Sequence, residues 1–340
     1  MLGNRALAET GKVPKSPAAM RPFTHRVWCF FNLWMAKILS SWTFSWQRFT
    51  QPLPPSMRPT TVKHYESRPK LPVRIFYPDN YKSGQKLPVF LCIHSGGFAM
   101  NDAESDDEWC RMWSNRTNML IASMEHSKAP QHAFPTPVYD IAALAVSVLD
   151  DTDLPIDKDR VVLGGFSSGA NIALGAAQLP EVKGRVKAAL VFFTAIDFGI
   201  HYQDKVKNKP YKSLGPELLE SASDWMDWGY VSAGQDRHDP LLSPYWAKRE
   251  DLPTWICTIG AEYDILRMEC QQWMCELAGL EHIQEESFER GTLKWILATR
   301  CTHLFTHHWG MKGEKKRRRE AKAEPVYVEV EAWLKKALEI

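Results

Sequence analysis

Short apolar runs alternate with amphipathic stretches along most of the 340-residue chain. The apolar runs have the length and the β-branched content of buried strands, whereas the stretches between them repeat apolar residues at helical spacing. The expected strands cover 62–66, 73–77, 87–94, 119–126, 160–165, 185–197, 253–260 and 292–299. The expected helices cover 138–149, 168–178, 266–277 and 327–338. Buried strands that alternate with helices predict a mostly parallel central sheet with helices on both faces, which is an α/β fold.

Two segments fall outside this alternation. Residues 198–248 contain the helical, aromatic stretch PELLESASDWMDWGYV, which we interpret as a helical cap inserted over one end of the sheet. The proline-dense stretch QPLPPSMRPT, residues 51–60, is typical of a linker. The pattern therefore predicts an N-terminal part, 1–60, with a polar tail and an aromatic helix, and a main α/β domain, 61–340, that carries the cap.

The apolar stretch 27–46, VWCFFNLWMAKILSSWTFSW, predicts an amphipathic helix with an aromatic face. The residues that recur at helical spacing are Trp28, Phe31, Met35, Leu39, Trp42 and Trp46. Lysine, asparagine and serine residues interrupt the stretch, which argues against a membrane span of about 20 apolar residues. Three interpretations stay open: packing against the cap around an apolar pocket, contact with a membrane interface, or a membrane anchor. The tryptophan-rich cap favours mutual packing.

The segment GGFSSGAN, residues 164–171, follows an apolar strand and precedes a helix of small residues. Around Ser167 it fits the pattern G-x-S-x-G, which in this context is typical of a nucleophile elbow, a strained bend that exposes one serine above the sheet. The following helix directs its N-terminus at that serine, where its dipole favours developing negative charge. A serine-bearing turn without chemistry is the simpler alternative, because glycine and serine are common.

A second glycine pair, in the segment HSGG at 94–97, follows the end of another buried strand. Attack of a serine on a carbonyl group creates an oxyanion, which must be held by preorganised N–H donors. Without side chains, Gly96 and Gly97 leave their amides open to a substrate. We expect these two amides and that of Ser168 to form an oxyanion hole, although a glycine pair after a strand can also be a simple turn.

A nucleophilic serine needs a base, and the base needs a carboxylate that orients it. Asp264 follows the strand 253–260, and His303 follows the strand 292–299. Because the carboxyl ends of parallel strands meet at one edge of a sheet, both side chains should lie near Ser167. The chain order serine, aspartate, histidine is the order that the α/β-hydrolase topology requires.

These motifs resemble the hormone-sensitive-lipase-like group of α/β-hydrolases, which carries an H-G-G-G oxyanion motif and a G-D-S-A-G nucleophile motif. The resemblance runs from about residue 70 to the C-terminus, and it includes SKAPQHAFPTPVYD, DPLLSPYWA, EYDILR and HLFTH. It implies an α/β-hydrolase fold, hydrolysis of carboxylic esters without a cofactor, and a cap built partly from the N-terminal helices. It also implies the catalytic triad Ser167, Asp264 and His303.

The sequence departs from the family motifs at three positions. Ser95 replaces a glycine of the oxyanion motif, which leaves the Gly96 and Gly97 amides in place. Phe166 replaces the aspartate beside the nucleophile, which removes a charge and adds an apolar wall. Leu304 replaces the glycine after the histidine, which makes the geometry of that loop less certain. We expect Phe98 and Phe166 to flank the substrate pocket.

Two histidines and one glutamate compete for the roles of base and acid. His307 and His308 lie close to His303 in the sequence, but the family's His-Gly-Phe block aligns with His303. Glu262 could replace Asp264 as the acid, although its longer side chain and the register of the EYD segment favour Asp264.

Composition narrows the remaining classes. Lys+Arg total 42 and Asp+Glu 40, so the chain has no excess of positive charge that would indicate binding to nucleic acid. Seven cysteines without a CxxC pair indicate reduced, buried thiols. Cys301 lies near His303, but no nucleophile elbow surrounds it, so we do not expect it to be a nucleophile. Residues 1–24 do not fit a cleaved signal peptide, so we expect a cytoplasmic protein, with membrane contact through 27–46 as the open alternative. The basic run 312–322 is interpreted as a solvated helix face rather than a nuclear signal or a lipid patch.

The sequence therefore predicts a serine hydrolase that cleaves a small to medium apolar ester through an acyl-enzyme, with no metal and no cofactor. Two alternatives remain on the same scaffold. One is a lactonase or a lyase-like enzyme of specialised metabolism, and the other is a non-catalytic small-molecule receptor. The sequence indicates neither the oligomeric state nor the identity of the ester.

Overall fold

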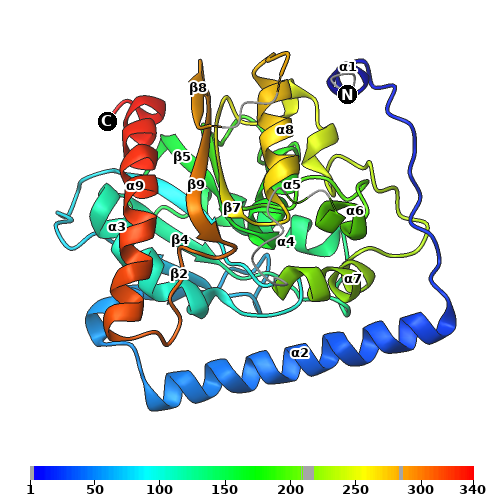
Figure 1. Ribbon diagram of the computed structural model, residues 1–340. Helices are drawn as coiled ribbons and strands as arrows, with labels where there is room; N and C mark the ends of the chain where they lie inside the picture. Colours follow the sequence, from blue (N-terminus) through cyan, green and yellow to red (C-terminus); the bar gives the residue numbers. More distant parts are fainter. Residues whose placement is uncertain (1–3, 208, 210–217, 283–285) are drawn as a thin grey trace.

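A computed structural model describes residues 4–207, 209, 218–282 and 286–340. Its described residues form a nine-stranded sheet in the order β1-β2-β4-β3-β5-β6-β7-β9-β8 (Figure 1). The strands are β1 (Thr61–Lys63), β2 (Val73–Phe76), β3 (Leu87–Ile93), β4 (Leu120–Met124), β5 (Ile156–Phe166), β6 (Ala188–Phe192), β7 (Trp255–Tyr263), β8 (Phe288–Arg290) and β9 (Leu293–Thr302). The six strands from β4 to β9 in this order pair in parallel, and β1, β2 and β8 pair antiparallel at the edges.

Helices cover both faces of the sheet, as the alternation predicted. They are α1 (Asn4–Thr10), α2 (Phe23–Thr50), α3 (Asp107–Thr117), α4 (Thr136–Asp150), α5 (Ser168–Ala177), α6 (Tyr202–Lys207), α7 (Leu218–Tyr230), α8 (Arg267–Leu277) and α9 (Gly313–Leu338). Short 3₁₀ turns lie at Pro55–Met57, Ala103–Asp106, Pro244–Trp246 and Arg249–Asp251. The mostly parallel sheet between helical layers confirms the predicted α/β architecture.

The two faces of the sheet follow the two-residue period of its strands. In β3, Val89 and Leu91 belong to the apolar core under α4 and α5. Phe90 and Cys92 belong to the core on the opposite face, under α3 and α9. Each central strand is thus buried on both sides, which explains why its sequence reads as a continuous apolar run.

Several elements differ from the sequence expectation. No helix is expected from the sequence pattern at α3, because buried tryptophans alternate there with charged residues. The expected strand 185–197 is β6, which is shorter, because the backbone turns to a positive φ of 40° at Phe193. The basic run 312–322 lies in the first turns of α9, and most of its charged side chains are exposed.

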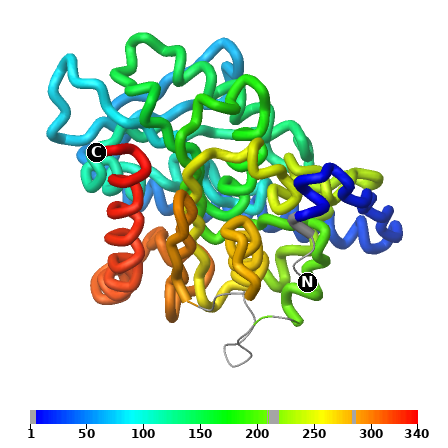
Figure 2. The backbone as a smooth tube through the Cα atoms, turned by 90° about the horizontal axis from the view of Figure 1, so that it is seen from above, coloured from blue at the N-terminus to red at the C-terminus, as the bar shows by residue number. Residues whose placement is uncertain are grey.

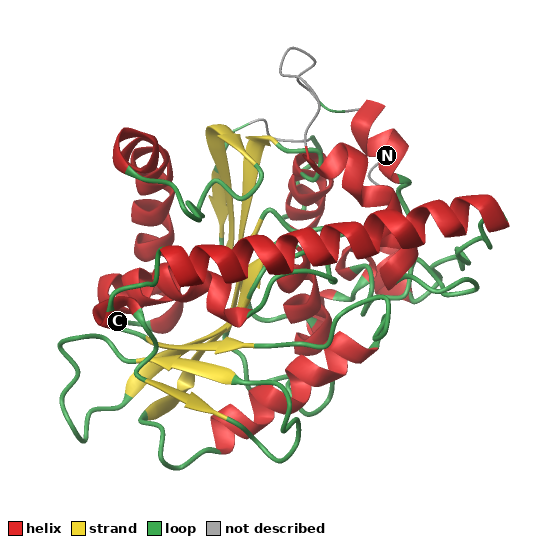
Figure 3. Ribbon diagram, turned by 90° about the horizontal axis from the view of Figure 1, so that it is seen from below, coloured by secondary structure: helices red, strands yellow, loops and turns green. Residues whose placement is uncertain are grey.

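The cap is formed by α2, α6 and α7. Helix α2 runs across the molecule past one end of the sheet, and α7 lies between it and the core (Figures 1 and 3). The N-terminal segment lies beside the segment around 235, and Ala18 donates a backbone hydrogen bond to Gln235 (Figure 2). Within the described residues, no helix is both long and apolar enough to cross a membrane.

Candidate active site

Ser167 stands at the bend between β5 and α5. Its backbone has φ 52° and ψ −119°, a left-handed conformation that is unusual for serine. The bend requires glycine on both sides, because a Cβ atom at Gly165 or at Gly169 would overlap the carbonyl oxygen of Ile93 on β3. The strand–turn–helix geometry of the predicted elbow is therefore present, with α5 starting directly after the serine.

Asp264 and His303 lie beside this serine. The Nε2 atom of His303 is 3.0 Å from the Oγ atom of Ser167, and its Nδ1 atom is 2.7 Å from Asp264. Asp264 is fully buried, and it also accepts the backbone N–H of Leu266 at 2.9 Å. The structure thus brings the three predicted side chains together as one hydrogen-bonded chain.

The competing residues lie elsewhere. His307 is buried with its ring 4.5 Å from that of Phe166 and its Nε2 atom 3.3 Å from Asp106. His308 lies 3.3 Å from a carboxylate oxygen of Glu108. Glu262 accepts the backbone N–H of Arg300 at 2.6 Å, so its carboxylate is turned to another loop. None of these three side chains is paired with Ser167.

The second glycine motif forms a tight loop next to the serine. Gly96 and Gly97 have φ angles of 145° and 57°, and a Cβ atom at Gly96 would overlap the carbonyl oxygen of Met100. Among the described residues, no backbone carbonyl accepts the amide of Gly96, Gly97 or Ser168. Around the elbow, three amide donors are therefore not engaged by any backbone carbonyl of the described residues, as an oxyanion hole requires.

A buried polar network, which the sequence analysis did not identify, supports this loop. His94 is fully buried, with Nε2 3.0 Å from Glu125 and Nδ1 2.6 Å from the carbonyl oxygen of Ser95. Lys128 also pairs with Glu125. Burial opposes ionisation of Glu125, but the charges of His94 and Lys128 outweigh it and hold the pKa of that carboxyl well below its usual range. The segment EHSK at 125–128 contained these residues without any motif to single them out.

Two cavities meet at Ser167. The large cavity, about 880 Å³, lies between the sheet edge, α7 and α2. Its α2 wall consists of Ala36, Leu39, Ser40, Thr43, Phe44 and Gln47. The small cavity, about 90 Å³, lies on the other side of Met226 and is lined by Phe98, Phe198 and Ile200 among others. Gly97 and Ser167 line both cavities, so the serine stands where the two join.

Of the two residues predicted to flank the substrate pocket, Phe98 lies at a cavity, and the prediction for Phe166 is wrong. Phe98 lines the small cavity and stacks on Tyr230 with ring centres 3.8 Å apart. Phe166, however, lines neither of these cavities, and its side chain is fully buried against Trp109 and Phe192. The reason is the strand period: Phe166 shares the face of Val162 in β5, which points to α3 and α9 and away from the cap.

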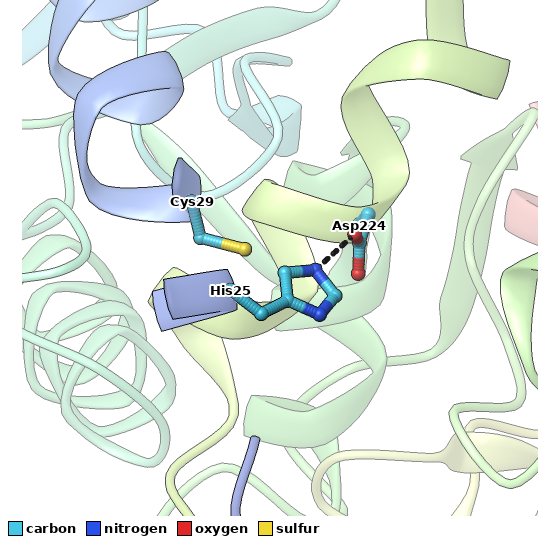
Figure 4. A group of neighbouring side chains, drawn as sticks. All are labelled: His25, Cys29 and Asp224. Atoms are coloured by element: carbon cyan, nitrogen blue, oxygen red, sulfur yellow. Dashed lines mark hydrogen bonds and ion pairs between the residues drawn. The ribbon is translucent and has the colours of Figure 1, made fainter. Parts of the chain in front are cut away.

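Three potential metal ligands connect α2 to α7. His25 and Cys29 project from α2 towards Asp224, and their ligand atoms lie within 4.8 Å of one another (Figure 4). Arg21 donates to Asp224 and lies 3.5 Å from the sulfur of Cys29, so a permanent cation already occupies this group. Burial also raises the pKa of the Cys29 thiol, which disfavours the thiolate that a metal needs. We therefore interpret the group as a link between two cap helices.

Among the curated relatives, two esterases each match about three fifths of the chain. The arylesterase of Saccharolobus solfataricus is 27% identical over 206 residues, which is 58% of this chain and 63% of the relative. Carboxylesterase NlhH of Mycobacterium tuberculosis is 28% identical over 207 residues, 60% of this chain and 64% of the relative. In both cases the match spans less than two thirds of the relative's own length.

A solved structure extends the likeness to almost the whole chain. The hyperthermophilic esterase from the archaeon Pyrobaculum calidifontis superposes with a TM-score of 0.67 over 94% of this chain and 98% of its own, at 22% identity. At that identity the superposition bears on the fold alone. Residues 90–285, more than half of the chain, match the alpha/beta hydrolase fold family. Together with the motifs at 94–97 and 164–171, these matches show that the chain belongs to the α/β-hydrolases, in their hormone-sensitive-lipase-like group.

Proposed function

We propose that the protein hydrolyses carboxylic esters, with Ser167 as the nucleophile, His303 as the base and Asp264 as the residue that orients it. The observation that carries this proposal is the hydrogen-bonded chain from Asp264 through His303 to Ser167, with its serine in the strained elbow. The esterase names of the relatives support the same reaction class.

In the proposed reaction, Nε2 of His303 takes the proton of Ser167 as Oγ attacks the ester carbonyl. Asp264 holds the imidazole in the required tautomer and stabilises its charged form. The amides of Gly96, Gly97 and Ser168 stabilise the oxyanion, and His303 then protonates the leaving alcohol. Water, activated by the same histidine, releases the acid from the acyl-serine.

The shape of the site supports a substrate with two unequal apolar arms. A planar ester bound at Ser167 extends in two directions, and one cavity lies in each. We propose that the longer arm lies along α2 in the large cavity and that a short arm occupies the small cavity. Apolar side chains such as Phe44, Trp225 and Met226 line the large cavity, so the long arm is expected to be hydrocarbon or aromatic.

The test is hydrolysis of p-nitrophenyl esters of increasing chain length by the wild type and by Ser167→Ala. The variant should fold normally and lose about 10³-fold or more in rate, because nucleophilic attack is removed. Near-wild-type hydrolysis by Ser167→Ala would overturn the assignment.

A fluorophosphonate and isotopic water separate the alternatives. Labelling of Ser167 together with water oxygen in the acid product supports an ester or lactone hydrolase, and a lactone panel separates these two. Turnover without incorporated water oxygen would indicate a lyase. Tight ligand binding without labelling or turnover would indicate a receptor.

A further inference from the structure

The side of α2 that faces away from the cavity carries a continuous row of large apolar side chains. They follow one another at helical spacing, and each is between 46% and 81% exposed: Trp28, Phe31, Met35, Ile38, Trp42, Trp46 and Phe49. We call this row the outer face of α2. The residues Cys29 and Leu33 are buried on the opposite side, so the helix already has a packed face towards α7.

The exposure of the outer face is unusual for a protein in water. Single exposed apolar residues are ordinary, but a contiguous row of this size marks an interaction surface. Within the described residues, nothing packs over it. Helix α2 lies along the outside of the molecule, where a flat partner could reach its whole length (Figure 3).

The charges around the outer face are basic. Helix α2 contains Arg26, Lys37 and Arg48 and has no aspartate or glutamate, and only Arg48 is paired, with Asp102 and Glu104 outside the helix. Its C-terminal half lies beside the loop that leads into α9, where the ring of Trp309 is 5.4 Å from that of Phe44. The start of α9 carries exposed cations without a carboxylate partner among the described residues: Lys312, Lys315 and Arg317.

This combination points to a lipid surface rather than to a second copy of the chain. Tryptophan and phenylalanine beside lysine and arginine suit the boundary between acyl chains and anionic headgroups. Two copies that met through α2 would bring like charges together, because Arg26 and Lys37 have no carboxylate partner among the described residues and the helix itself offers none. The exposed row runs along one side of α2 for most of its length, so the proposed contact lies in the plane of the interface.

We propose that the outer face of α2 and the unpaired cations at the start of α9 bind the surface of an anionic phospholipid bilayer. The opposite side of the same helix is the α2 wall of the large cavity. Docking through the outer face therefore holds that cavity about 10 Å from the lipid, which is one helix diameter. The sequence alone set packing against the cap and membrane contact as rivals, and the two faces of α2 make them compatible.

The experiment is co-sedimentation of the full chain with vesicles of phosphatidylcholine alone and of phosphatidylcholine mixed with phosphatidylglycerol. The wild type should sediment with the mixed vesicles, less with the neutral ones, and less again at high salt. The triple variant Phe31→Ser, Trp42→Ser, Trp46→Ser should bind at least ~10-fold more weakly, since it loses buried apolar area. The triple variant Lys312→Gln, Lys315→Gln, Arg317→Gln should lose the preference for the anionic lipid.

A matched control removes exposed apolar side chains from other surfaces: Val62→Ser, Tyr139→Ser, Val328→Ser. It should sediment like the wild type, and Ser167→Ala should too, so lipid binding is measured apart from the proposed catalysis. The proposal is overturned if the wild type stays in the supernatant with both vesicles, or if the control loses binding as much as the outer-face variant. A concentration-dependent dimer in light scattering that the outer-face variant abolishes would also overturn it, in favour of a second copy.

Discussion

Ser167, Asp264 and His303 each follow a strand of the parallel sheet, whereas the α2 wall of the large cavity lies outside the sheet and is held by side chains. Arg21 pairs with Asp224 and Asp227 of α7, and Lys37 donates to the carbonyl oxygen of Ala129 at 2.6 Å. The sheet edge that carries these three residues thus inherits its geometry from backbone hydrogen bonds between strands. The α2 wall depends on side-chain contacts, both the charged ones and the packing of Cys29 and Leu33, which substitutions can remove.

The sheet edge and the cap should therefore differ in how substitutions affect ester hydrolysis. The proposed reaction needs its reacting side chains to be placed to within about 0.5 Å, and only rigid elements hold side chains that precisely. A substrate cavity that accepts one apolar arm tolerates more variation, and its wall can move as a unit. Substitutions at the sheet edge should therefore change the rate of every ester, and substitutions in the cap should change the choice among esters.

The largest effect is expected from the histidines. His303→Ala should lower the hydrolysis rate by about 10³-fold or more, because the base is lost. His308→Ala is the matched control, since His308 lies near in sequence but pairs with Glu108 instead. Rates with a short ester and labelling by a fluorophosphonate measure both. Equal losses in the two variants would remove His303 from its proposed role.

This part of the site could be predicted from sequence for a physical reason. Apolar runs reveal where parallel strands end. Ser167, Asp264 and His303 each follow such a run, so they must meet at one edge of the sheet. The wrong prediction for Phe166 has a related cause, because motif spacing does not show which face of the strand a neighbour occupies. The network of His94, Glu125 and Lys128 depends on side-chain contacts between strands, which no single-sequence pattern contains.

A second prediction concerns the network under the oxyanion loop. Glu125→Gln removes the charged partner of the partly buried Lys128, which keeps its hydrogen bond to the carbonyl oxygen of His126, so the free energy of unfolding should fall by about 1–3 kcal/mol. The folded pKa of Glu125 is depressed, so its stabilisation is present at neutral pH and is lost as the pH falls below about 4.3, the ordinary glutamate pKa. Urea unfolding at a series of pH values measures this. The variant should lose less stability than the wild type on acidification, and parallel pH curves would contradict the assignment.

A third prediction concerns a substitution that should loosen the cap and leave the sheet unchanged. Arg21→Met should lower stability by about 1–3 kcal/mol, because Asp224 and Asp227 lose a partly buried partner. Asp227 keeps Arg237, so the change should be local to α2. Limited proteolysis should cut the segment around 11–22, which leads into α2, faster, while hydrolysis of a short acetate ester stays near the wild-type rate. Lys183→Met is the matched control, since it removes an ion pair to Asp251 on another surface; equal proteolysis of the two variants would contradict the link.

The smallest expected effect tests whether the two faces of α2 have separate functions. Phe44 lines the large cavity, whereas Trp42 stands on the outer face and lines neither cavity. Each CH₂ group buried by the cavity contributes up to about 0.8 kcal/mol, so kcat/KM for a chain-length series should rise by at most a few-fold per carbon until the cavity is full. Phe44→Ala removes part of the apolar wall, so it should reduce that slope and leave acetate esters almost unchanged. Trp42→Ala removes an equally aromatic side chain from the same helix and should keep the wild-type slope in solution. If both variants keep the wild-type slope, the long arm does not lie along α2; if both lose it, the helix acts as a whole and its two faces do not have separate functions.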